Sequence, residues 1–379
     1  MQRDIAPAIR KSLPQKIVLL SGPRQVGKTT LSRSLDPKCA CLNHDSAEHR
    51  LLLRRKEWPR DAPLLVLDEL HKMKSWKSWL KGVYDTEGLH PPILVTGSSR
   101  LDIAKKMGDS LAGRFFQFRL HPLSLTELRA DDPALDLDQG FAKLMKFGGF
   151  PEPFLAEDPA FLGRWQASHL DVILRQDLLD LGSVRDISDI ETLIELLSHR
   201  VGQLVSFESL ARDLERSATT VKRWLTVLEN MYVIFSLTPY FTSITRSLRQ
   251  ARKYFFYDAS RVKTGDGARF ENLVALALRK ECDRLADCDG RRSRLHFLRT
   301  KDGREVDFLF KTDETVTLIE TKWSDDQFSQ DLKHFAQFFP GAGLRVFQVV
   351  ASLKQEREVF RGPKMVKAAG WLAALPGVR

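Results

Sequence analysis

A phosphate-binding loop is the strongest chemical signal in the sequence. Four apolar residues, 17–20, precede the spacing Gly22-x4-Gly27-Lys28-Thr29, and a helical pattern follows. This order of strand, loop and helix lets backbone N–H groups surround a phosphate at a helix N-terminus. Lys28 would reach the β- and γ-phosphates of ATP, and the Thr29 hydroxyl would hold Mg²⁺. The loop residues expected to contact the nucleotide are Gly22, Pro23, Arg24, Gln25, Val26, Gly27, Lys28, Thr29 and Thr30.

Two acids at the end of an apolar stretch are the expected partners of this loop. Residues 64–69 read LLVLDE, so a strand buried on both faces would end in Asp68 and Glu69. The carboxyl ends of such strands form the ligand-binding edge of an α/β sheet. Asp68 would bind Mg²⁺, mostly through water, and Glu69 would polarise the attacking water. The alternative is a strand that ends in a solvated acidic turn.

Three further residues are candidates for sensing the γ-phosphate or assisting its hydrolysis. Residues 93–99 read ILVTGSS, and Thr96 or Ser98 at the end of this strand would sense the phosphate or orient the water. The alternative is a polar strand end followed by a turn. Arg114 precedes a Phe-rich strand pattern and is the candidate arginine finger, since such hydrolysis often needs an arginine from the same chain or a neighbour. The alternative is a surface arginine.

Charged residues inside a C-terminal hairpin pattern suggest a second site. EVDFLF and TVTLIETKW read as strands joined by KTDET. With Asp313 and Glu314 at the centre of the turn, antiparallel pairing places Asp307 opposite Glu320, with Cβ atoms about 4.5–5.5 Å apart. Lys322 then lies on the same face. Two carboxylates and a lysine suit Mg²⁺ or Mn²⁺ and the activation of a water, but a slip by one residue would separate them.

Glu271 is a further acid with two interpretations. It stands near the start of a helical pattern at 268–280, where the helix dipole favours a carboxylate. Alternatively, it points at a site built by the strands that follow.

The composition is that of a folded protein with two or three domains. The chain has 379 residues, of which 43% are hydrophobic and 28% charged. No apolar run approaches the length of a membrane helix, and residues 1–16 lack the apolar core of a signal peptide, so we expect a cytoplasmic protein without a membrane partner. The four cysteines follow neither a zinc spacing nor a disulfide framework. The net charge of +10 fits DNA as a partner, or a generally basic protein.

The middle of the chain predicts a winged helix-turn-helix. Ser217 is a good N-cap for a helix in which Val221, Leu225 and Leu228 share one face. In a DNA-binding version this helix enters the major groove and a basic wing contacts phosphates. The alternative is a lid or an interdomain brace. The polar residues of the helix are Thr219, Thr220, Lys222, Arg223 and Thr226, and those assigned to the wing are Arg246, Arg249, Arg252 and Lys253.

Several blocks, in order along the chain, resemble a family of prokaryotic AAA-superfamily ATPases. The blocks are GPRQVGKTTL, LLVLDELHKMKSWKSWLKGVYD, ILVTGSSRL, SLAGRFFQFRLHPLSLTEL and FGGFPEPFL. The resemblance implies an ATPase domain, a winged helix, and a C-terminal domain of unknown function with a restriction-endonuclease-like fold. It also supports Arg114 as the finger, because that residue falls in the SLAGR block.

The hairpin pattern D–x12–E-x-K also resembles the metal site of PD-(D/E)xK nucleases. That resemblance implies Asp307 and Glu320 as metal ligands, Lys322 beside the attacking water, and Glu271 as the acid on the preceding helix. Val306 stands where a proline often precedes the first aspartate. An active nuclease and a retained scaffold without cleavage activity both remain open.

Together, these inferences predict an α/β protein with three domains. We expect an AAA-type P-loop ATPase domain at 1–182, a winged helix at 183–262, and a PD-(D/E)xK nuclease-like α/β domain at 263–379. The expected function is binding and hydrolysis of ATP with Mg²⁺ and action on DNA, with possible metal-dependent cleavage. The alternative is a nucleotide-operated switch with a catalytically inactive C-terminal module. An arginine finger acting on a neighbour would require a homo-oligomer.

Overall fold

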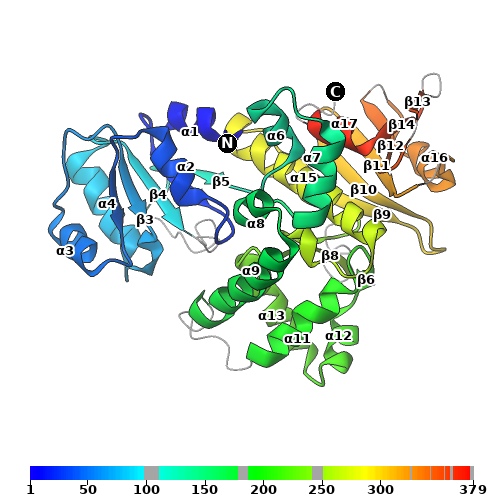
Figure 1. Ribbon diagram of the computed structural model, residues 1–379, viewed down its shortest axis with the longest axis horizontal. Helices are drawn as coiled ribbons and strands as arrows, with labels where there is room; N and C mark the ends of the chain where they lie inside the picture. Colours follow the sequence, from blue (N-terminus) through cyan, green and yellow to red (C-terminus); the bar gives the residue numbers. More distant parts are fainter. Residues whose placement is uncertain are drawn as a thin grey trace.

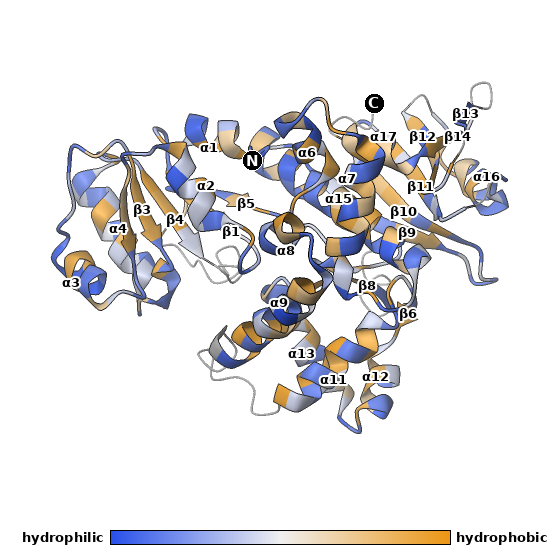
Figure 2. Cartoon of the chain, viewed as in Figure 1, coloured by the Kyte–Doolittle hydropathy of each residue, from blue (hydrophilic) through white to orange (hydrophobic). Residues whose placement is uncertain are grey.

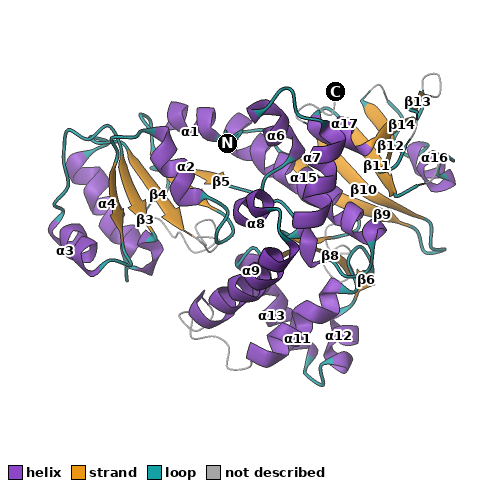
Figure 3. Cartoon of the chain, viewed as in Figure 1, coloured by secondary structure: helices purple, strands orange, loops and turns teal. Residues whose placement is uncertain are grey.

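The structure is a computed structural model with three groups of elements (Figure 1). It describes residues 1–97, 111–177, 187–240, 251–324, 327–341, 343–353, 355–358 and 362–375. One parallel sheet with its helices lies at one end, a second large sheet lies at the other, and a mainly helical group lies below the junction (Figures 1 and 3). The expected α/β class is confirmed for the first group by its parallel sheet.

The N-terminal sheet has five parallel strands in the order β2-β3-β4-β1-β5. Ile17 and Leu19 of β1 lie in one hydrophobic core, whereas Val18 and Leu20 lie in another. Strand alternation therefore buries both faces of the sheet, and its strands are correspondingly apolar (Figure 2). Its elements are α1 (Ala6–Ser12), β1 (Ile17–Ser21), α2 (Lys28–Leu35), β2 (Ala40–Asn43), α3 (Ala47–Arg55), β3 (Leu65–Asp68), η1 (Leu70–Lys72), α4 (Trp76–Glu87), β4 (Ile93–Gly97) and β5 (Phe115–Arg119).

Four helices follow the sheet and lead to the centre of the molecule. They are α6 (Leu125–Asp131), α7 (Leu137–Phe147), α8 (Pro151–Ala156) and α9 (Pro159–Val172), which continues into the π-helical turn η2 (Ile173–Asp177). Helix α7 begins at Leu137, after the N-cap Asp136. At Gly140 this helix packs tightly against Leu125 and Leu135.

The middle group combines helices with a small antiparallel sheet of order β6-β8-β7. Val221, Trp224, Leu225 and Leu228 of α13 are buried, as the predicted apolar face requires. The elements are α11 (Ile187–Ser198), β6 (Leu204–Val205), α12 (Phe207–Asp213), α13 (Ala218–Asn230), β7 (Ile234–Leu237), β8 (Arg252–Phe256) and η3 (Ala259–Arg261).

The C-terminal group places a long helix against a mixed six-stranded sheet of order β13-β14-β12-β11-β10-β9. One face of this sheet and α15 belong to the largest hydrophobic core, and α16 covers a separate core on the other face. The elements are α15 (Asp266–Asp289), β9 (Ser293–Arg299), β10 (Glu305–Thr312), β11 (Val316–Lys322), α16 (Gln330–Ala336), β12 (Leu344–Val350), β13 (Arg357–Glu358), β14 (Lys364–Lys367) and α17 (Ala368–Ala373).

The predicted register of the C-terminal hairpin is confirmed. Phe308 pairs with Ile319 and Lys311 with Val316, so the register places Asp307 level with Glu320. The Thr312 N–H donates to the Thr315 carbonyl at 2.9 Å, which leaves Asp313 and Glu314 at the centre of the turn. The hairpin therefore carries its acids on one face as expected.

The largest core extends beyond the C-terminal group. It contains Leu125 of α6, Leu144 of α7, Leu228 of α13, Phe270 of α15 and Leu372 of α17. Helices from the first half of the chain thus share one hydrophobic core with its last helix. Within the described ranges, no helix is long and apolar enough to cross a membrane.

Candidate functional site

The loop between β1 and α2 has the backbone geometry of a phosphate site. Gly22 has φ +154°, and an added Cβ would lie 2.3 Å from the Leu120 carbonyl oxygen, so no side chain fits there. Gly27 has φ +96° and caps α2, which exposes the first N–H groups of that helix. Lys28 is 7% exposed, and its ammonium donates to the carbonyls of Gly22 at 3.1 Å and Pro23 at 2.7 Å. The lysine is therefore held against the loop that would receive the phosphates.

The remaining loop residues differ in exposure. Val26 is buried beneath the loop, Arg24 is half-buried, and Gln25 and Thr30 are exposed. Gln25 also has φ +58°, a conformation that turns the chain sharply. Of the predicted contacts, Gln25 and Thr30 thus offer their backbone groups rather than a buried side chain.

Asp68 lies at the centre of a polar cluster at the carboxyl edge of the sheet. Its Oδ2 accepts a hydrogen bond from the Thr29 hydroxyl at 3.0 Å and from the Asn43 amide at 3.4 Å. The buried Thr96 hydroxyl donates to Oδ1. The structure therefore brings together Thr29, Asp68 and Thr96 as expected. Asn43 was missed, although its place at the end of a neighbouring strand was the available signal.

Glu69 presents a buried carboxylate oxygen at the same edge. Its backbone has φ +55° in the turn after β3, and its Oε2 has no hydrogen-bond partner among the described residues. The His71 ring nitrogen Nε2 lies 3.8 Å from this oxygen, and the Lys72 ammonium lies 3.9 Å from it. Burial raises the pKa of Glu69, while the Lys28 and Lys72 ammonium groups oppose that shift. A buried acceptor without a donor is what a water-orienting group requires before its water is bound.

This set of donors fits a nucleotide with Mg²⁺. The glycine-lined loop offers N–H groups to phosphates, and hard oxygen ligands such as Thr29 and Asp68 are those that Mg²⁺ prefers. Ser98, the other candidate at the end of β4, lies outside the described residues.

Arg114 lies at the amino ends of the parallel strands, whereas the phosphate loop lies at their carboxyl ends. Its carbonyl accepts from the N–H of Ile17, at the start of β1, whereas the phosphate loop follows Ser21 at the end of β1. Its guanidinium donates to Asp85 of α4 at 2.9 Å. Arg114 therefore does not reach the phosphate loop of its own chain.

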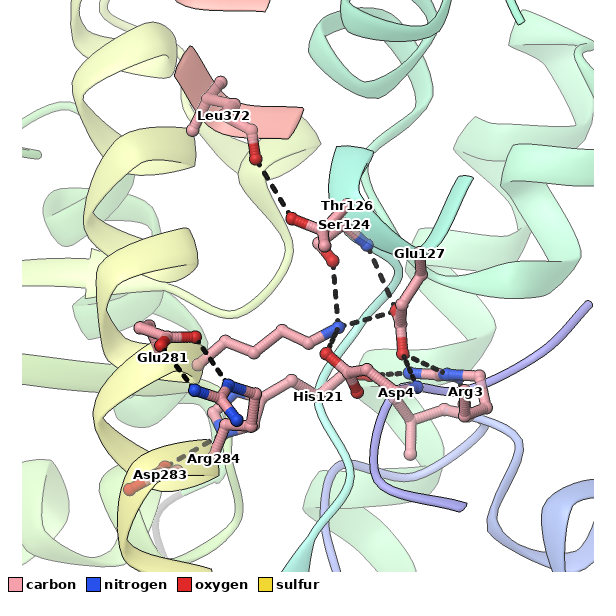
Figure 4. A network of polar contacts seen from close by, with 12 residues as sticks. Arg3, Asp4, His121, Ser124, Thr126, Glu127, Glu281, Asp283, Arg284 and Leu372 are labelled. Atoms are coloured by element: carbon pink, nitrogen blue, oxygen red, sulfur yellow. Dashed lines mark hydrogen bonds and ion pairs between the residues drawn. The ribbon is translucent and has the colours of Figure 1, made fainter. Parts of the chain in front are cut away.

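A buried ionic network supports the loop from the N-terminal segment (Figure 4). The Arg3 guanidinium donates to the Val26 carbonyl at 3.1 Å, to Glu127 at 2.9 Å and to the His121 carbonyl. Lys280 of α15 binds the same Glu127 carboxylate at 2.6 Å. Although burial favours the protonated acid, Arg3 and Lys280 outweigh it and hold the pKa of Glu127 well below its usual range. No local pattern pointed to Arg3, because its partners lie far along the chain.

Replacing Arg3 with methionine should lower the free energy of unfolding by about 3 kcal/mol, since a buried carboxylate loses a charged partner. Urea unfolding followed by fluorescence measures this loss. Arg10→Met, in the exposed part of α1, is the matched control and should change stability little. Equal stability of the two variants would contradict a supporting role for Arg3.

The middle group also touches the phosphate loop. The Tyr232 hydroxyl lies 3.1 Å from the Ser21 hydroxyl at the end of β1. The His169 ring nitrogen Nε2 lies 3.3 Å from the Arg24 carbonyl, and Nδ1 lies 3.4 Å from the Arg261 guanidinium. Burial, and next Arg261, lower the pKa of His169 to about 3 despite the bond to the Arg24 carbonyl. A neutral His169 therefore joins the loop to the middle group.

This neutral histidine predicts a pH-dependent stability. The pKa falls from 6.5 in the unfolded chain to about 3 when folded, so below pH 6.5 the unfolded state binds a proton that the folded state does not. Wild type should lose about 2 kcal/mol more than His169→Asn between pH 7 and pH 5. Denaturant unfolding at both pH values measures the difference. Exposed His199→Asn is the control, and parallel pH profiles for wild type and His169→Asn would contradict the assignment.

The structure also brings the C-terminal acids close together, but around a lysine. The Lys253 ammonium lies 3.2 Å from Glu271, 2.6 Å from Glu305 and 3.6 Å from Asp307. The Lys322 ammonium lies 3.0 Å from Glu320. Lys253 was assigned to a phosphate-contacting wing, which is wrong, because it is 1% exposed and ion-paired. Arg246 and Arg249 of that wing lie outside the described residues.

Burial and mutual repulsion shift the acids of this cluster. Burial, and next the Asp307 carboxylate, raise the pKa of Glu271 to about 7 and that of Glu320 to about 8. Burial disfavours a charged Lys253, but Glu271, Asp307 and Glu305 outweigh it and raise the pKa of Lys253. Within the described part of the chain, no group of three or more acid, histidine or cysteine side chains is arranged to hold a metal ion. The arrangement of these acids therefore does not fit the metal site expected of a nuclease.

Comparison with known families assigns the first third of the chain. Residues 14–129 match a model described as an AAA domain, 138–264 a domain of unknown function (DUF8612), and 266–367 a domain of unknown function (DUF4143). The parallel sheet, the phosphate loop and this match define the N-terminal part as a P-loop ATPase domain of the AAA superfamily. Such a domain binds a nucleotide, typically with Mg²⁺.

Similar proteins are known by sequence from bacteria and archaea. Uncharacterized proteins of Mycobacterium tuberculosis and Mycobacterium bovis are each 30% identical over 263 residues, or 68% of this chain and 58% of theirs. The chain thus spans less than two thirds of these relatives' length. An uncharacterized protein of Haemophilus influenzae is 22% identical over 80% of this chain and 82% of its own. A signal transduction ATPase with numerous domains from Pyrococcus horikoshii is 15% identical over 75% of this chain and 47% of its own, with a TM-score of 0.31.

Proposed function

We propose that this protein binds ATP with Mg²⁺ and hydrolyses it. The observation that carries the proposal is the buried Glu69 oxygen, which accepts no hydrogen bond from the described residues, beside the Thr29–Asp68 pair and the phosphate loop. Thr29 and Asp68 would hold the metal, which when bound offsets phosphate charge. Glu69 would accept a hydrogen bond from the attacking water, whose oxygen bonds to the γ-phosphorus as the bond to ADP breaks. Lys28 and the loop N–H groups would hold the phosphates in place, and Thr96 would fix the Asp68 carboxylate.

Replacing Lys28 tests nucleotide binding directly. Lys28→Ala should abolish hydrolysis and weaken binding of a fluorescent ATP analogue at least about tenfold, because the side chain that meets the β- and γ-phosphates is removed. Lys38→Ala, an exposed lysine beyond α2, is the matched control. Unchanged affinity and phosphate release in Lys28→Ala would refute the proposal.

We further propose that binding and hydrolysis of ATP change the conformation of the middle group. The protein would then act as a nucleotide-operated switch. The supporting contacts are those of Tyr232 with Ser21 and of His169 with the Arg24 carbonyl, because both touch the segment that would hold phosphate. Hydrogen exchange with and without a non-hydrolysable ATP analogue tests this. Nucleotide should change exchange in α9 and in residues 230–234, and protection confined to residues 1–97 would count against transmission.

DNA is the proposed partner of the middle group, which we assign as a winged helix. The order β6, α12, α13, β7, β8 supports this assignment, as does the exposed polar face of α13. That face carries Thr219, Lys222, Arg223 and Thr226. Fluorescence anisotropy measures the affinity for duplex DNA. The double variant Lys222→Glu/Arg223→Glu should bind the duplex more weakly than wild type. The control Arg164→Glu, an exposed position in α9, should bind it as wild type does. Equal affinity of both variants and wild type would exclude DNA binding by α13.

The three segments 1–182, 183–262 and 263–379 are retained as the proposed domains.

If Arg114 is the arginine finger, hydrolysis would require an assembly of subunits, because Arg114 lies at the other end of the strands from its own phosphate loop. We therefore propose a homo-oligomer in which Arg114 of one subunit serves the nucleotide of the next.

A further inference from the structure

Lys253 lies inside the C-terminal acidic cluster, which we define as Glu271, Glu305, Asp307 and Glu320. The lysine comes from β8 of the middle group, where it pairs with Leu204 of β6 and Leu237 of β7. The acids come from α15, β10 and β11. Its ammonium contacts three of the four carboxylates at 2.6 to 3.6 Å. A cation delivered by one group of elements is thus enclosed by acids from another.

The other oxygens of the cluster are also engaged by protein groups. Oδ2 of Asp307 accepts from the Thr321 N–H at 2.9 Å and from the Thr321 hydroxyl at 2.7 Å. Oε1 of Glu320 is paired with Lys322 at 3.0 Å, and its Oε2 accepts weakly from the Asp307 N–H at 3.4 Å. A divalent ion such as Mg²⁺ needs about six oxygen ligands near 2.1 Å in octahedral geometry. Binding it here would require breaking most of these bonds.

Space around Glu271 is also limited. Gly202, which precedes β6, has φ +73°, and an added Cβ would lie 2.2 Å from Oε2 of Glu271. The Lys253 ammonium also lies 5.6 Å from the centre of the Phe297 ring, which is fully buried. Backbone from the middle group and an aromatic ring from β9 therefore close the cluster around the lysine.

We propose that Lys253 is the resident cation of the acidic cluster, so that the cluster joins the middle group to the C-terminal domain and does not bind a divalent metal. A buried ammonium and buried carboxylates are each costly alone, and they stabilise the folded state only together. The hairpin acids then hold β8 against β10 and α15 instead of activating water. This joint is independent of ATP hydrolysis.

Counting bound Mn²⁺ tests the proposal on the full-length protein without nucleotide. Electron paramagnetic resonance measures free Mn²⁺ during titration of wild type and Asp307→Asn. Any ion at the phosphate loop binds equally to both, so the two proteins should bind the same number of ions. One ion fewer in Asp307→Asn would overturn the proposal. Mn²⁺-dependent DNA cleavage by wild type that Asp307→Asn abolishes would overturn it as well.

A double-mutant cycle tests the joint itself. Lys253→Met should lower the melting temperature, because it leaves buried acids without their cation. Lys253→Met/Glu271→Gln should regain about half of this loss, since the second change removes one of the unpaired charges. Lys364→Met on β14, which breaks an exposed pair with Glu358 of β13, should leave the melting temperature unchanged. A wild-type melting temperature for Lys253→Met, or purely additive losses in the double variant, would refute the joint. If Lys253→Met does not fold, the comparison of Mn²⁺ counts between wild type and Asp307→Asn decides.

Discussion

Replacing Glu69 with glutamine should slow ATP hydrolysis by about 10²–10⁴-fold, because an amide accepts a proton from water far less well than a carboxylate. ATP affinity should change little, since glutamine keeps the size of the side chain and Glu69 is not among the loop residues that would hold the phosphates. Single-turnover phosphate release and binding of a fluorescent ATP analogue measure the two effects separately.

The matched control is Glu87→Gln at the end of α4, where the carboxylate pairs with Arg60 at 3.0 Å. This change should leave hydrolysis intact. A wild-type rate for Glu69→Gln would show that another group orients the water. Loss of ATP affinity in Glu69→Gln would instead place Glu69 among the binding groups.

Replacing Arg114 with alanine should lower hydrolysis by about 10³-fold or more, provided that subunits assemble. Arg114 lies beside Ile17, and Ser21 is four residue steps further along β1, or roughly 13 Å at the usual rise of a strand. The side chain is paired with Asp85 and lies 5.9 Å from the centre of the Tyr84 ring. We therefore expect hydrolysis per subunit in wild type to rise with protein concentration, and this rise to vanish in Arg114→Ala.

Complementation distinguishes an arginine that serves a neighbour from a structural one. Glu69→Gln keeps its arginine and Arg114→Ala keeps its glutamate, so a mixture of the two contains interfaces with both groups. The mixture should hydrolyse ATP although each variant alone does not. Arg60→Ala, an exposed arginine over Trp58, is the control. No recovery on mixing, or full activity of Arg114→Ala alone, would exclude this role.

Short-range patterns predicted much of the fold and the nucleotide site. The loop glycines, Lys28 and Thr29 were predicted because strand, turn and helix are adjacent in sequence, and Asp68 and Glu69 were predicted because they end an apolar stretch. The hairpin register was correct for the same reason, since two residues at the turn determine every pair above it. The apolar face of α13 followed from helical spacing.

Long-range partners could not be predicted. Lys253 follows a basic segment and was assigned to a surface wing, because the acids that pair with it lie up to 54 residues further on. Arg3 lies 124 residues from Glu127, and no spacing rule connects them. Arg114 stays a prediction as an arginine finger, and its distance from its own loop follows from the parallel pairing of β5 with β1, which the sequence did not provide.

The shared core of α6, α7 and α17 affects how the chain folds during its synthesis on the ribosome. Leu125 and Leu144 bury their side chains in the same core as Leu372, and the Thr126 hydroxyl donates to the Leu372 carbonyl at 3.0 Å. During synthesis, these first helices emerge about 230 residues before their final partner. At roughly 5–20 residues per second, the delay is on the order of 10–50 s. For that time the nascent protein exposes an apolar helical surface that is an obvious target for chaperones or for a neighbouring nascent chain.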